Sequence, residues 1–452
     1  MRVAVYSPLP PQRSGIADYT AELMPALAEH HELELVVEPG WTPATELDRW
    51  RRRAAAELPA ALSRGEVDLA LYHLGNNAEF HTGIWRTALA APGVVVLHDF
   101  VLHHLVRGMA QDAGDPQLLD RELLRAYGPA GGRAARRARE TGAALDPFRW
   151  PLFERVVDRS LAVLVHSRFA RDRVLRSRPH ARIAVVPHHL SLPAAAAMSR
   201  AEARQALGLE LDVPLVGAFG LMTPVKRPHV LLQALRAVRE RLPAARLLVV
   251  GEVSPHFHGA AELFAEPGVV VAGRQELDRF LLHMRAVDVA VNLRFPVAGE
   301  TSGTLVRLLG MGQPVVVTEA GSFAEIPDDC CAKVPLDITE AETLAAVLLA
   351  LLTDEPLRRT MGDNARRWCG GRHALAASAR GYAELLAEVA RDPRRPGPEL
   401  ATAALPGVTP TDLWGRVLGR AGRELADLGV DDADDATLLA VSRAAAELGE
   451  RT

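Results

Sequence analysis

Short apolar, β-branched runs alternate with longer helical patterns along most of this 452-residue chain. Alternation of this kind is typical of parallel α/β layers, because two parallel strands need a crossover connection, usually a helix, between them. In the first half the predicted strands are Val3–Tyr6, Leu33–Val37, Leu69–His73, Val94–His98, Val163–His166 and Ile183–Pro187. In the second half they are Leu215–Phe219, Leu247–Gly251, Val269–Ala272, Val287–Val291 and Val315–Thr318. The sequence therefore predicts two α/β blocks of the same architecture, joined near Leu190–Asp212.

The remaining segments suggest how the blocks are bounded. Ser199 and Glu202 form a capping-box pattern that predicts a short helix inside the joint. The segment after Ala374 has the periodicity of an amphipathic helix, and a Pro- and Arg-rich linker follows Arg391. We predict a domain at 1–198 with a helical insertion at about 102–159, a second domain at 199–372, a crossover helix at 373–392 and a small helical tail at 399–452.

Composition excludes some classes of function. The 52 Lys and Arg residues nearly balance the 56 Asp and Glu residues, so nothing indicates a nucleic-acid partner. The three cysteines lack metal-ligand spacing and fit reduced thiols in a cytosol. A strand begins at once, which leaves no room for a signal peptide, and the longest apolar run is too short to cross a bilayer. We expect a cytoplasmic protein, and the high Arg and Ala content resembles that of bacteria with GC-rich genomes.

The most informative stretch is 292–329. A predicted strand precedes a loop that holds Glu300, and then Thr301, Ser302, Gly303 and Thr304 begin a helix that leads to a second strand. Free amides at a helix N-terminus bind anionic oxygens, and small residues let a ligand approach closely. Glu300 would repel a diphosphate but can accept hydrogen bonds from sugar hydroxyls. The stretch therefore predicts a nucleotide-sugar site, the alternative being an ordinary strand–helix–strand crossover with a chance Glu.

The same stretch resembles the donor-binding region of retaining GT-B glycosyltransferases of family 4. That family has a Glu, a Gly three residues on, a second Glu on the following helix, and then a small-x-Gly-x-Pro-Val-Val run. Glu300, Gly303 and the run at 310–316 match this pattern, in the form Gly-Glu-Thr-Ser-Gly that marks a subgroup. The second Glu, which holds the nucleotide ribose in the family, is absent, since its place falls at Arg307 or Leu308.

The resemblance covers roughly residues 1–390 and implies the GT-B arrangement, in which two Rossmann-like domains face each other across a cleft and a C-terminal helix crosses back. It implies a retaining transferase that moves a sugar from a nucleotide-diphosphate sugar to a hydroxyl of a saccharide or lipid-linked acceptor, in polysaccharide or glycoconjugate synthesis. Glu300 would then orient the sugar hydroxyls, while the amides at 301–304 would bind the diphosphate.

Lys226 lies just beyond the first strand of the second block. By resemblance it is the Lys of the family's Gly-Arg-x-x-x-x-Lys segment, whose two cations neutralise the leaving diphosphate. The Arg of that segment is replaced by Leu221, and Arg227 is the adjacent cation that can substitute for it. The alternative is that Lys226 is only a solvated surface charge.

In the first block, Gly15 lies in a loop that enters a helix and resembles the family's glycine loop near the diphosphate and the acceptor. Asp18 lies in the first turn of that helix, and Ser14 also fits a plain helix cap. His98 ends a predicted strand, where open α/β sheets place ligands, and matches a family His beside the donor sugar. Asn76 and Asn77 end another strand on that side and are candidate acceptor contacts.

The predicted cleft offers no Asp-x-Asp metal motif, and no Gly-x-Gly-x-x-Gly follows the first strand. We therefore expect no metal and no cofactor, with the nucleotide-sugar as a substrate. No pair of carboxylates can be assigned to double displacement, so we expect front-face attack. One rival interpretation is a GT-B nucleotide-sugar epimerase, which the motifs fit poorly. The other is a non-catalytic sugar-nucleotide-binding partner subunit, to which the missing Glu and Arg give weight.

Two arginine-rich segments, 49–53 with Trp50 and 133–139, fall in the predicted acceptor-side domain. Basic patches with a nearby Trp can rest on anionic lipid, which would bring the protein to the inner membrane face. The alternative is that these are solvated helix faces.

Overall fold

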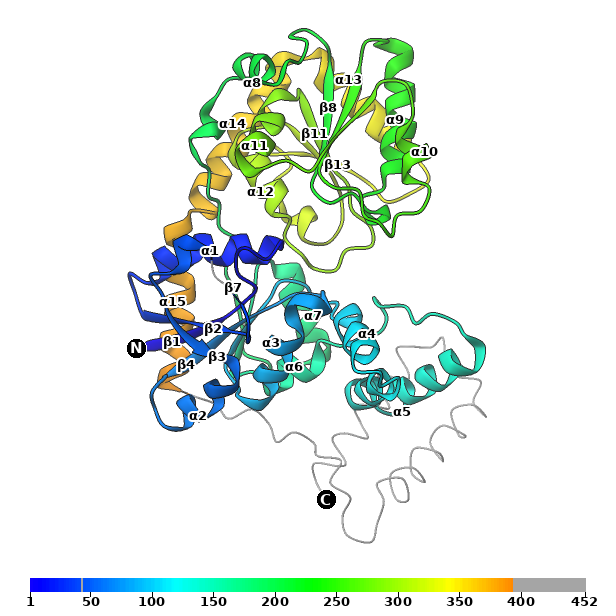
Figure 1. Ribbon diagram of the computed structural model, residues 1–452. Coiled ribbons are helices and arrows are strands. Elements are labelled where there is room, and N and C mark those ends of the chain that lie inside the picture. Colours follow the sequence, from blue (N-terminus) through cyan, green and yellow to red (C-terminus); the bar gives the residue numbers. More distant parts are fainter. Residues whose placement is uncertain (42–43, 393–452) are drawn as a thin grey trace.

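The computed structural model describes residues 1–41 and 44–392. Two lobes stand one above the other (Figure 1), and each is built around a single parallel sheet. The predicted fold class is confirmed: each domain is Rossmann-like, with helices on both faces of its sheet. The tail predicted at 399–452 lies outside the described residues.

The first sheet has the order β3-β2-β1-β4-β5-β6-β7. Its strands are β1 (Arg2–Tyr6), β2 (Glu32–Val37), β3 (Arg51–Ala54), β4 (Leu69–Leu74), β5 (Val94–Leu97), β6 (Ala162–Val165) and β7 (Ile183–Val185). Strands β4, β5 and β6 are buried along their whole length because helices cover both faces. Strand β3 was not predicted. It lies in an arginine-rich segment and is held at the sheet edge by the buried ion pair between Arg53 and Glu34.

The helices of the first domain are α1 (Gly15–Leu27), α2 (Leu58–Ser63), α3 (Ala78–Ala90), α4 (His103–Asp112), α5 (Gln117–Thr141), α6 (Glu154–Arg159) and α7 (Arg168–Ser177). The insertion predicted at about 102–159 is helical, as expected, and α4 and α5 extend from the side of the domain (Figure 1). Helix α5 is kinked where Gly128 takes a left-handed backbone conformation just before Pro129.

The second sheet has the order β10-β9-β8-β11-β12-β13. Its strands are β8 (Leu215–Phe219), β9 (Arg246–Val250), β10 (Val269–Gly273), β11 (Val289–Asn292), β12 (Val315–Thr318) and β13 (Ala332–Val334). Its helices are α8 (Arg200–Leu207), α9 (Pro228–Arg241), α10 (Ala260–Phe264), α11 (Leu277–Ala286), α12 (Gly303–Gly310), α13 (Glu340–Thr353) and α14 (Glu355–Arg372). The capping box predicted at Ser199 and Glu202 is confirmed. Strand β13, three residues long, was not predicted.

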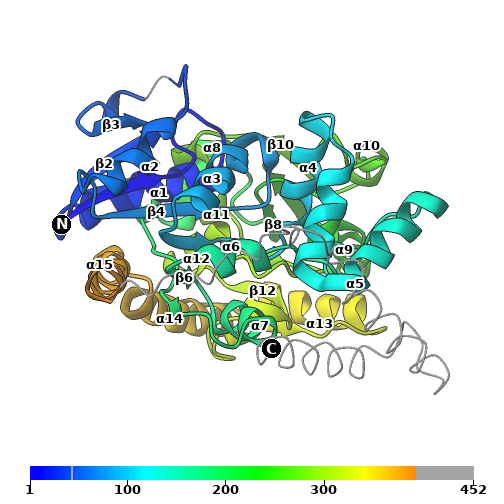
Figure 2. The ribbon, with the colours of Figure 1, turned by 90° about the horizontal axis from the view of Figure 1, so that it is seen from below.

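The chain crosses between the domains twice. The backbone amide of Leu190 donates to the carbonyl of His373 (2.7 Å), so the two crossings lie side by side. Helices α14 and α15 (Leu375–Arg391) follow one another down one side of the molecule (Figures 1 and 2). Helix α15 packs on the first domain, where the hydroxyls of Tyr382 and Tyr19 are hydrogen-bonded at 2.8 Å. This is the crossover helix that the amphipathic pattern predicts.

Candidate active site

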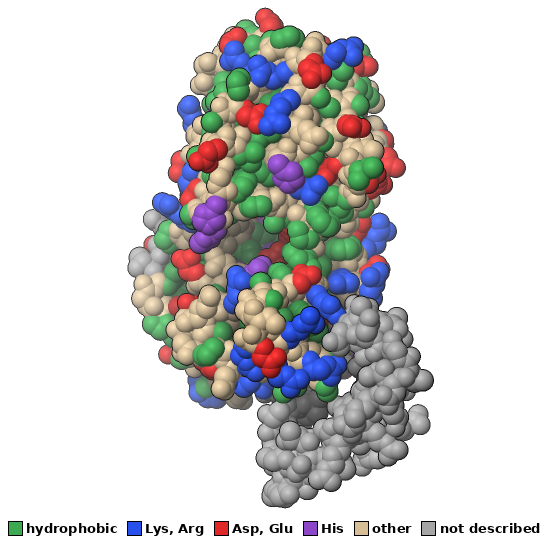
Figure 3. Space-filling view, turned by 90° about the vertical axis from the view of Figure 1, so that its right-hand side faces the viewer, with side chains coloured by type: hydrophobic (Ala, Val, Ile, Leu, Met, Phe, Trp, Pro, Cys, Tyr) green, Lys and Arg blue, Asp and Glu red, His purple; other side chains and the backbone are tan. Residues whose placement is uncertain are grey.

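The carboxyl ends of the two sheets face each other. The amide of Phe100, beyond β5, donates to the carbonyl of Ala298 on the loop after β11, at 3.0 Å. The next residue, Gly299, has φ +83°, and a Cβ added to it would overlap the Phe100 ring. Only glycine lets the loops approach so closely. Figure 3 shows a hollow between the two lobes, with histidine and acidic side chains visible in it.

Glu300 lies at the end of this loop. One of its carboxylate oxygens accepts from the Arg294 guanidinium at 2.7 Å, and the other accepts from the Ala298 amide at 2.8 Å. The Ser322 hydroxyl donates to the Glu300 backbone carbonyl at 3.0 Å. The carboxylate is therefore fixed in orientation and position before a ligand arrives.

The start of α12 follows directly. Ser302 caps the helix through its hydroxyl, which accepts from the Leu305 amide at 3.2 Å, and Gly303 is the first helical residue. A Cβ added to Gly303 would lie 3.6 Å from the His188 imidazole, so this helix start is close to the inter-domain crossing. Thr301 and Thr304 flank these two residues, and the predicted residues 301–304 together form one helix N-terminus.

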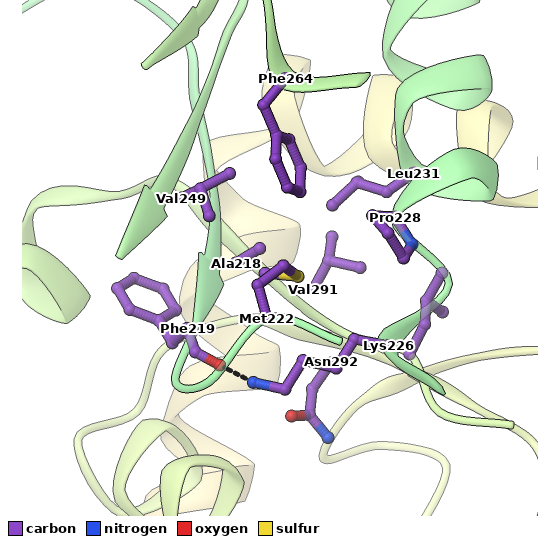
Figure 4. A pocket seen from close by; sticks show the side chains of 11 residues that line it. Ala218, Phe219, Met222, Lys226, Pro228, Leu231, Val249, Phe264, Val291 and Asn292 are labelled. Carbon is purple, nitrogen blue, oxygen red and sulfur yellow. Dashed lines mark hydrogen bonds between the residues drawn. The ribbon is translucent and has the colours of Figure 1, made fainter. Parts of the chain in front are cut away.

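Lys226 ends a short 3-10 turn, Pro224–Lys226, after β8. Its amine donates to the Phe219 carbonyl and lies beside Asn292 at the end of β11 (Figure 4). A Cβ built on Gly220 would lie 3.0 Å from the Lys226 nitrogen and 3.4 Å from the Thr304 hydroxyl, so the amine and the α12 N-terminus share one region. Burial, together with the charge of Arg294, lowers the pKa of Lys226 to about 7.

The glycine loop of the first domain lines a separate hollow that also includes Arg274 of the second domain. Gly15 has open space around its Cα, and Ser14 caps α1 by accepting from the Ile16 amide at 3.3 Å. The structure therefore shows Ser14 as a helix cap, and contact of Gly15 with a ligand stays a prediction. Burial raises the pKa of Asp18, and the charges of Arg307 and Arg274 oppose that rise.

His98 follows β5 and its Nε2 lies 3.0 Å from Nδ1 of His73 on β4. Burial lowers the pKa of His98 well below its usual value, so the ring is neutral at pH 7. The neighbouring Asp99 has its pKa raised to about 7 by burial and by the charge of Glu300, which lies across the cleft. Asp99 was not predicted as a site residue, although it follows the same strand end.

Asn76 and Asn77 lie at the end of β4, as predicted, and both side chains support helices. The Asn76 carbonyl oxygen accepts from the Leu105 amide at 3.1 Å, and Asn77 caps α3 by accepting from the Glu79 amide at 3.0 Å. Contact with an acceptor through these residues stays a prediction.

Comparison with known proteins agrees with this arrangement. Residues 213–354 match the family model described as glycosyl transferases group 1. A GDP-mannose-dependent alpha-(1-6)-phosphatidylinositol monomannoside mannosyltransferase of Mycolicibacterium smegmatis is 25% identical over 386 residues, which is 80% of this chain and 92% of that protein. A D-inositol 3-phosphate glycosyltransferase of Salinispora arenicola is 33% identical over 190 residues, but the match spans only 39% of this chain and 42% of that protein.

Solved structures show the same fold at low identity. Sucrose-phosphate synthase from Thermosynechococcus elongatus superposes with a TM-score of 0.61 at 16% identity, over 86% of this chain and 99% of that one. Anabaena HepE in complex with UDP-glucose gives 0.58 at 16% identity, over 86% of this chain and 100% of that one. The chain therefore has the GT-B fold, and its residues 213–354 are similar to glycosyl transferases group 1.

The two arginines near Lys226 differ in their partners. Arg227, the predicted substitute for the missing Arg, forms an ion pair with Glu340 at the start of α13 and lies 5.8 Å from the Phe295 ring centroid. Arg294 instead bonds Glu300 and lowers the pKa of Lys226. Arg294 is the functional candidate that sequence reasoning missed. Its signal was its position two residues beyond a buried strand, at the carboxyl end of the sheet.

Arg307, at the place of the missing second Glu, contacts the first domain. Its guanidinium donates to one Glu22 oxygen at 2.8 Å, and His189 lies 3.2 Å from the other. Helix α12 is thus tied to α1 at the position where the family that this stretch resembles has a ribose-binding carboxylate.

Within the described residues, no three His, Cys, Asp or Glu side chains are arranged to hold a metal ion. In the same part of the chain, none of the helices combines the length and hydrophobicity that a bilayer crossing requires.

Proposed function

We propose that this protein is a family 4 retaining glycosyltransferase that moves a sugar from a nucleotide-diphosphate sugar to a hydroxyl of a saccharide or lipid-linked acceptor. The observation that carries the proposal is the grouping of Lys226, Glu300 and the α12 N-terminus on one side of the cleft, with His98 on the other. Cations and free amides suit a leaving diphosphate, and a fixed carboxylate suits sugar hydroxyls.

In this mechanism the diphosphate lies against Lys226 and the amides at 301–304. Leu221 replaces the family's Arg, and Arg294 supplies the second positive charge. Arg227 and Arg294 are both ion-paired, but Arg294 is the one whose charge lowers the pKa of Lys226. Glu300 accepts hydrogen bonds from the sugar. The acceptor hydroxyl attacks from the side of the departing phosphate, which takes its proton, and no metal ion is needed for charge compensation.

The missing ribose carboxylate favours one alternative, a non-catalytic partner subunit that binds a sugar nucleotide. A panel of UDP-, GDP- and ADP-sugars separates the two. Release of nucleoside diphosphate with an acceptor, and an anomeric configuration kept in the product by NMR, would support the retaining transferase. Tight binding of a sugar nucleotide without turnover against any acceptor would support the partner subunit.

A lipid-linked acceptor at the inner membrane face remains part of the proposal in a narrower form. Arg53 is buried in its ion pair with Glu34, and Trp50 packs against the first-domain core. Arg51 and Arg52 are exposed, and on α5 Arg136 pairs with Glu140 and Arg139 with Asp120. The surface available to lipid is therefore less basic than the sequence alone indicates.

A further inference from the structure

Two imidazoles from neighbouring strands are hydrogen-bonded below the cleft. His73 lies on β4 and His98 directly follows β5, and their nitrogens, Nδ1 of His73 and Nε2 of His98, are 3.0 Å apart. His73 is completely buried, and its ring is parallel to that of Tyr382 with centroids 6.1 Å apart. The pair is therefore held rigidly by the first-domain core and by the crossover helix.

A hydrogen bond between two neutral imidazoles contains one proton, which belongs to one ring or the other. Burial lowers the pKa of His73 to about 3 and that of His98 well below its usual value, so both rings are neutral. Each neutral ring carries a single proton. Whichever ring donates in the shared bond therefore fixes where the protons of both rings are.

The surroundings of His73 decide between the two arrangements. Its Nε2 is buried and has no hydrogen-bond partner. If His73 accepted the shared proton at Nδ1, its own proton would sit on this Nε2 as a buried N–H without an acceptor, a rarer and more costly situation than an unused lone pair. His73 therefore donates from Nδ1, and His98 accepts at Nε2.

This arrangement of protons determines which group His98 presents to the cleft. A neutral His98 that accepts at Nε2 carries its proton on Nδ1. The hydrogen bond of the His98 ring to His73 uses Nε2 and leaves Nδ1 without a protein partner among the described residues. Unlike Nε2 of His73, this Nδ1 is not one of the buried atoms that lack a partner, so it is accessible. The accessible nitrogen of His98 is therefore a hydrogen-bond donor and has no lone pair with which to accept a proton.

We propose that His73 is a positioning residue that fixes His98 as the Nδ1-protonated tautomer, so that His98 donates a hydrogen bond to a hydroxyl oxygen of the donor sugar. The inference deepens the proposed function and rests on it for the identity of the ligand. The tautomer itself is a property of the protein without ligand.

Two variants test the positioning role. His73→Leu removes the donor but keeps an apolar side chain, and His73→Asn keeps an N–H near the position of Nδ1. We expect sugar transfer to fall about tenfold in His73→Leu, in line with the loss of one aligned donor to the reacting sugar, and to recover within about threefold of native in His73→Asn. Because the contact is to the sugar, affinity for UDP or GDP, measured by calorimetry, should stay unchanged in both.

Adding His98→Ala to His73→Leu should cost little more than His98→Ala alone, since His73 acts only through His98. Full activity of His73→Leu, or additive losses in the double variant, would overturn the positioning role. Weaker UDP or GDP binding would move the contact from the sugar to the diphosphate and overturn the sugar assignment.

Nitrogen NMR of the native protein tests the tautomer without a variant. The expected result is a protonated Nδ1 and an unprotonated Nε2 in His98, and the reverse would overturn the proposal. Failure of the proposed function would look different, because native protein would then release no sugar from any donor while the tautomer stayed as described.

Discussion

The two domains have the same parallel architecture but present different chemistry to the cleft. The second domain contributes charge: Lys226, Arg294 and Glu300, with a helix N-terminus between them. The first domain contributes neutral groups. His73 and His98 are uncharged, and the pKa of Asp99 is raised to about 7 by burial and by Glu300.

The difference has a physical reason. On the second domain Arg294 and Glu300 stabilise each other as an ion pair, whereas Lys226 has a carbonyl as its partner and its pKa is lowered to about 7. The two histidines of the first domain are desolvated with no acidic neighbour to favour their charged form, so they stay neutral, whereas Asp99 has Arg294 as an opposing charge. Under the proposed function, charge recognition of the diphosphate belongs to the second domain, while both domains hydrogen-bond the sugar, Glu300 as an acceptor and His98 as a donor.

Substitution of Glu300 is the strongest test of this difference between the two domains. We expect Glu300→Ala to lower sugar transfer by about a hundredfold or more, because an orienting contact made in the transition state is lost. Initial rates would be measured with whichever donor the panel identifies. Glu300→Gln, which keeps the size, and a thermal melt of each variant control for folding. Near-native rates in Glu300→Ala would remove this carboxylate from the site.

Lys226 tests whether the diphosphate belongs to the second domain. Lys226→Ala should weaken UDP or GDP binding about tenfold or more by calorimetry, since one cation on the diphosphate is lost. Arg227→Ala is the matched control. It removes a neighbouring cation that Glu340 already neutralises, so its effect should fall on stability and leave affinity nearly native. The opposite ranking would assign the diphosphate to Arg227.

The lowered pKa of Lys226 predicts a pH dependence of that binding. Above pH 7 the free amine loses its proton, whereas a bound diphosphate favours the protonated form, so binding must take up a proton. Nucleoside diphosphate affinity should therefore fall as pH rises from 7, by at most about tenfold per unit until the pKa of the complex is reached. In Lys226→Arg the slope should vanish, because a guanidinium stays charged. A slope that persists there would exclude Lys226 as its source.

The inter-domain ion pair should matter less. Glu22→Gln removes the partner of Arg307, and both side chains are about one-fifth exposed. We expect a loss of about 1 kcal/mol or less in stability, as for other partly exposed pairs, seen as a small shift in the thermal midpoint. A large loss would mean that this pair, and not only the packing of α15, holds the domains together.

The smallest effect is expected in binding to anionic lipid. Sedimentation with anionic liposomes should show weak binding at low salt that disappears at moderate salt, because few unpaired arginines remain on the first-domain surface. Absence of binding at low salt would point to an acceptor that is not presented by a membrane.

Local sequence determined much of the fold. Strands such as β8 and β12 were predicted at the residues the structure gives them, because a short apolar run of four or five residues is typical of a buried parallel strand. Strands β3 and β13 were missed for the converse reason. They are short edge strands, and β3 owes its place to an ion pair with Glu34, which lies far from it in sequence.

The same distinction applies to the candidate site. Glu300, Lys226 and the start of α12 could be identified from the sequence, because their residue types and spacing form local motifs. The role of Arg294 depends on its closeness to both Glu300 and Lys226. The role of His73 depends on the register of β4 against β5, which places it beside His98. These contacts arise only when sheets align their carboxyl ends and two domains close on each other. Local periodicity in the sequence determines where helices and strands form. Long-range packing determines which side chains are desolvated together, and desolvation sets their charge and protonation.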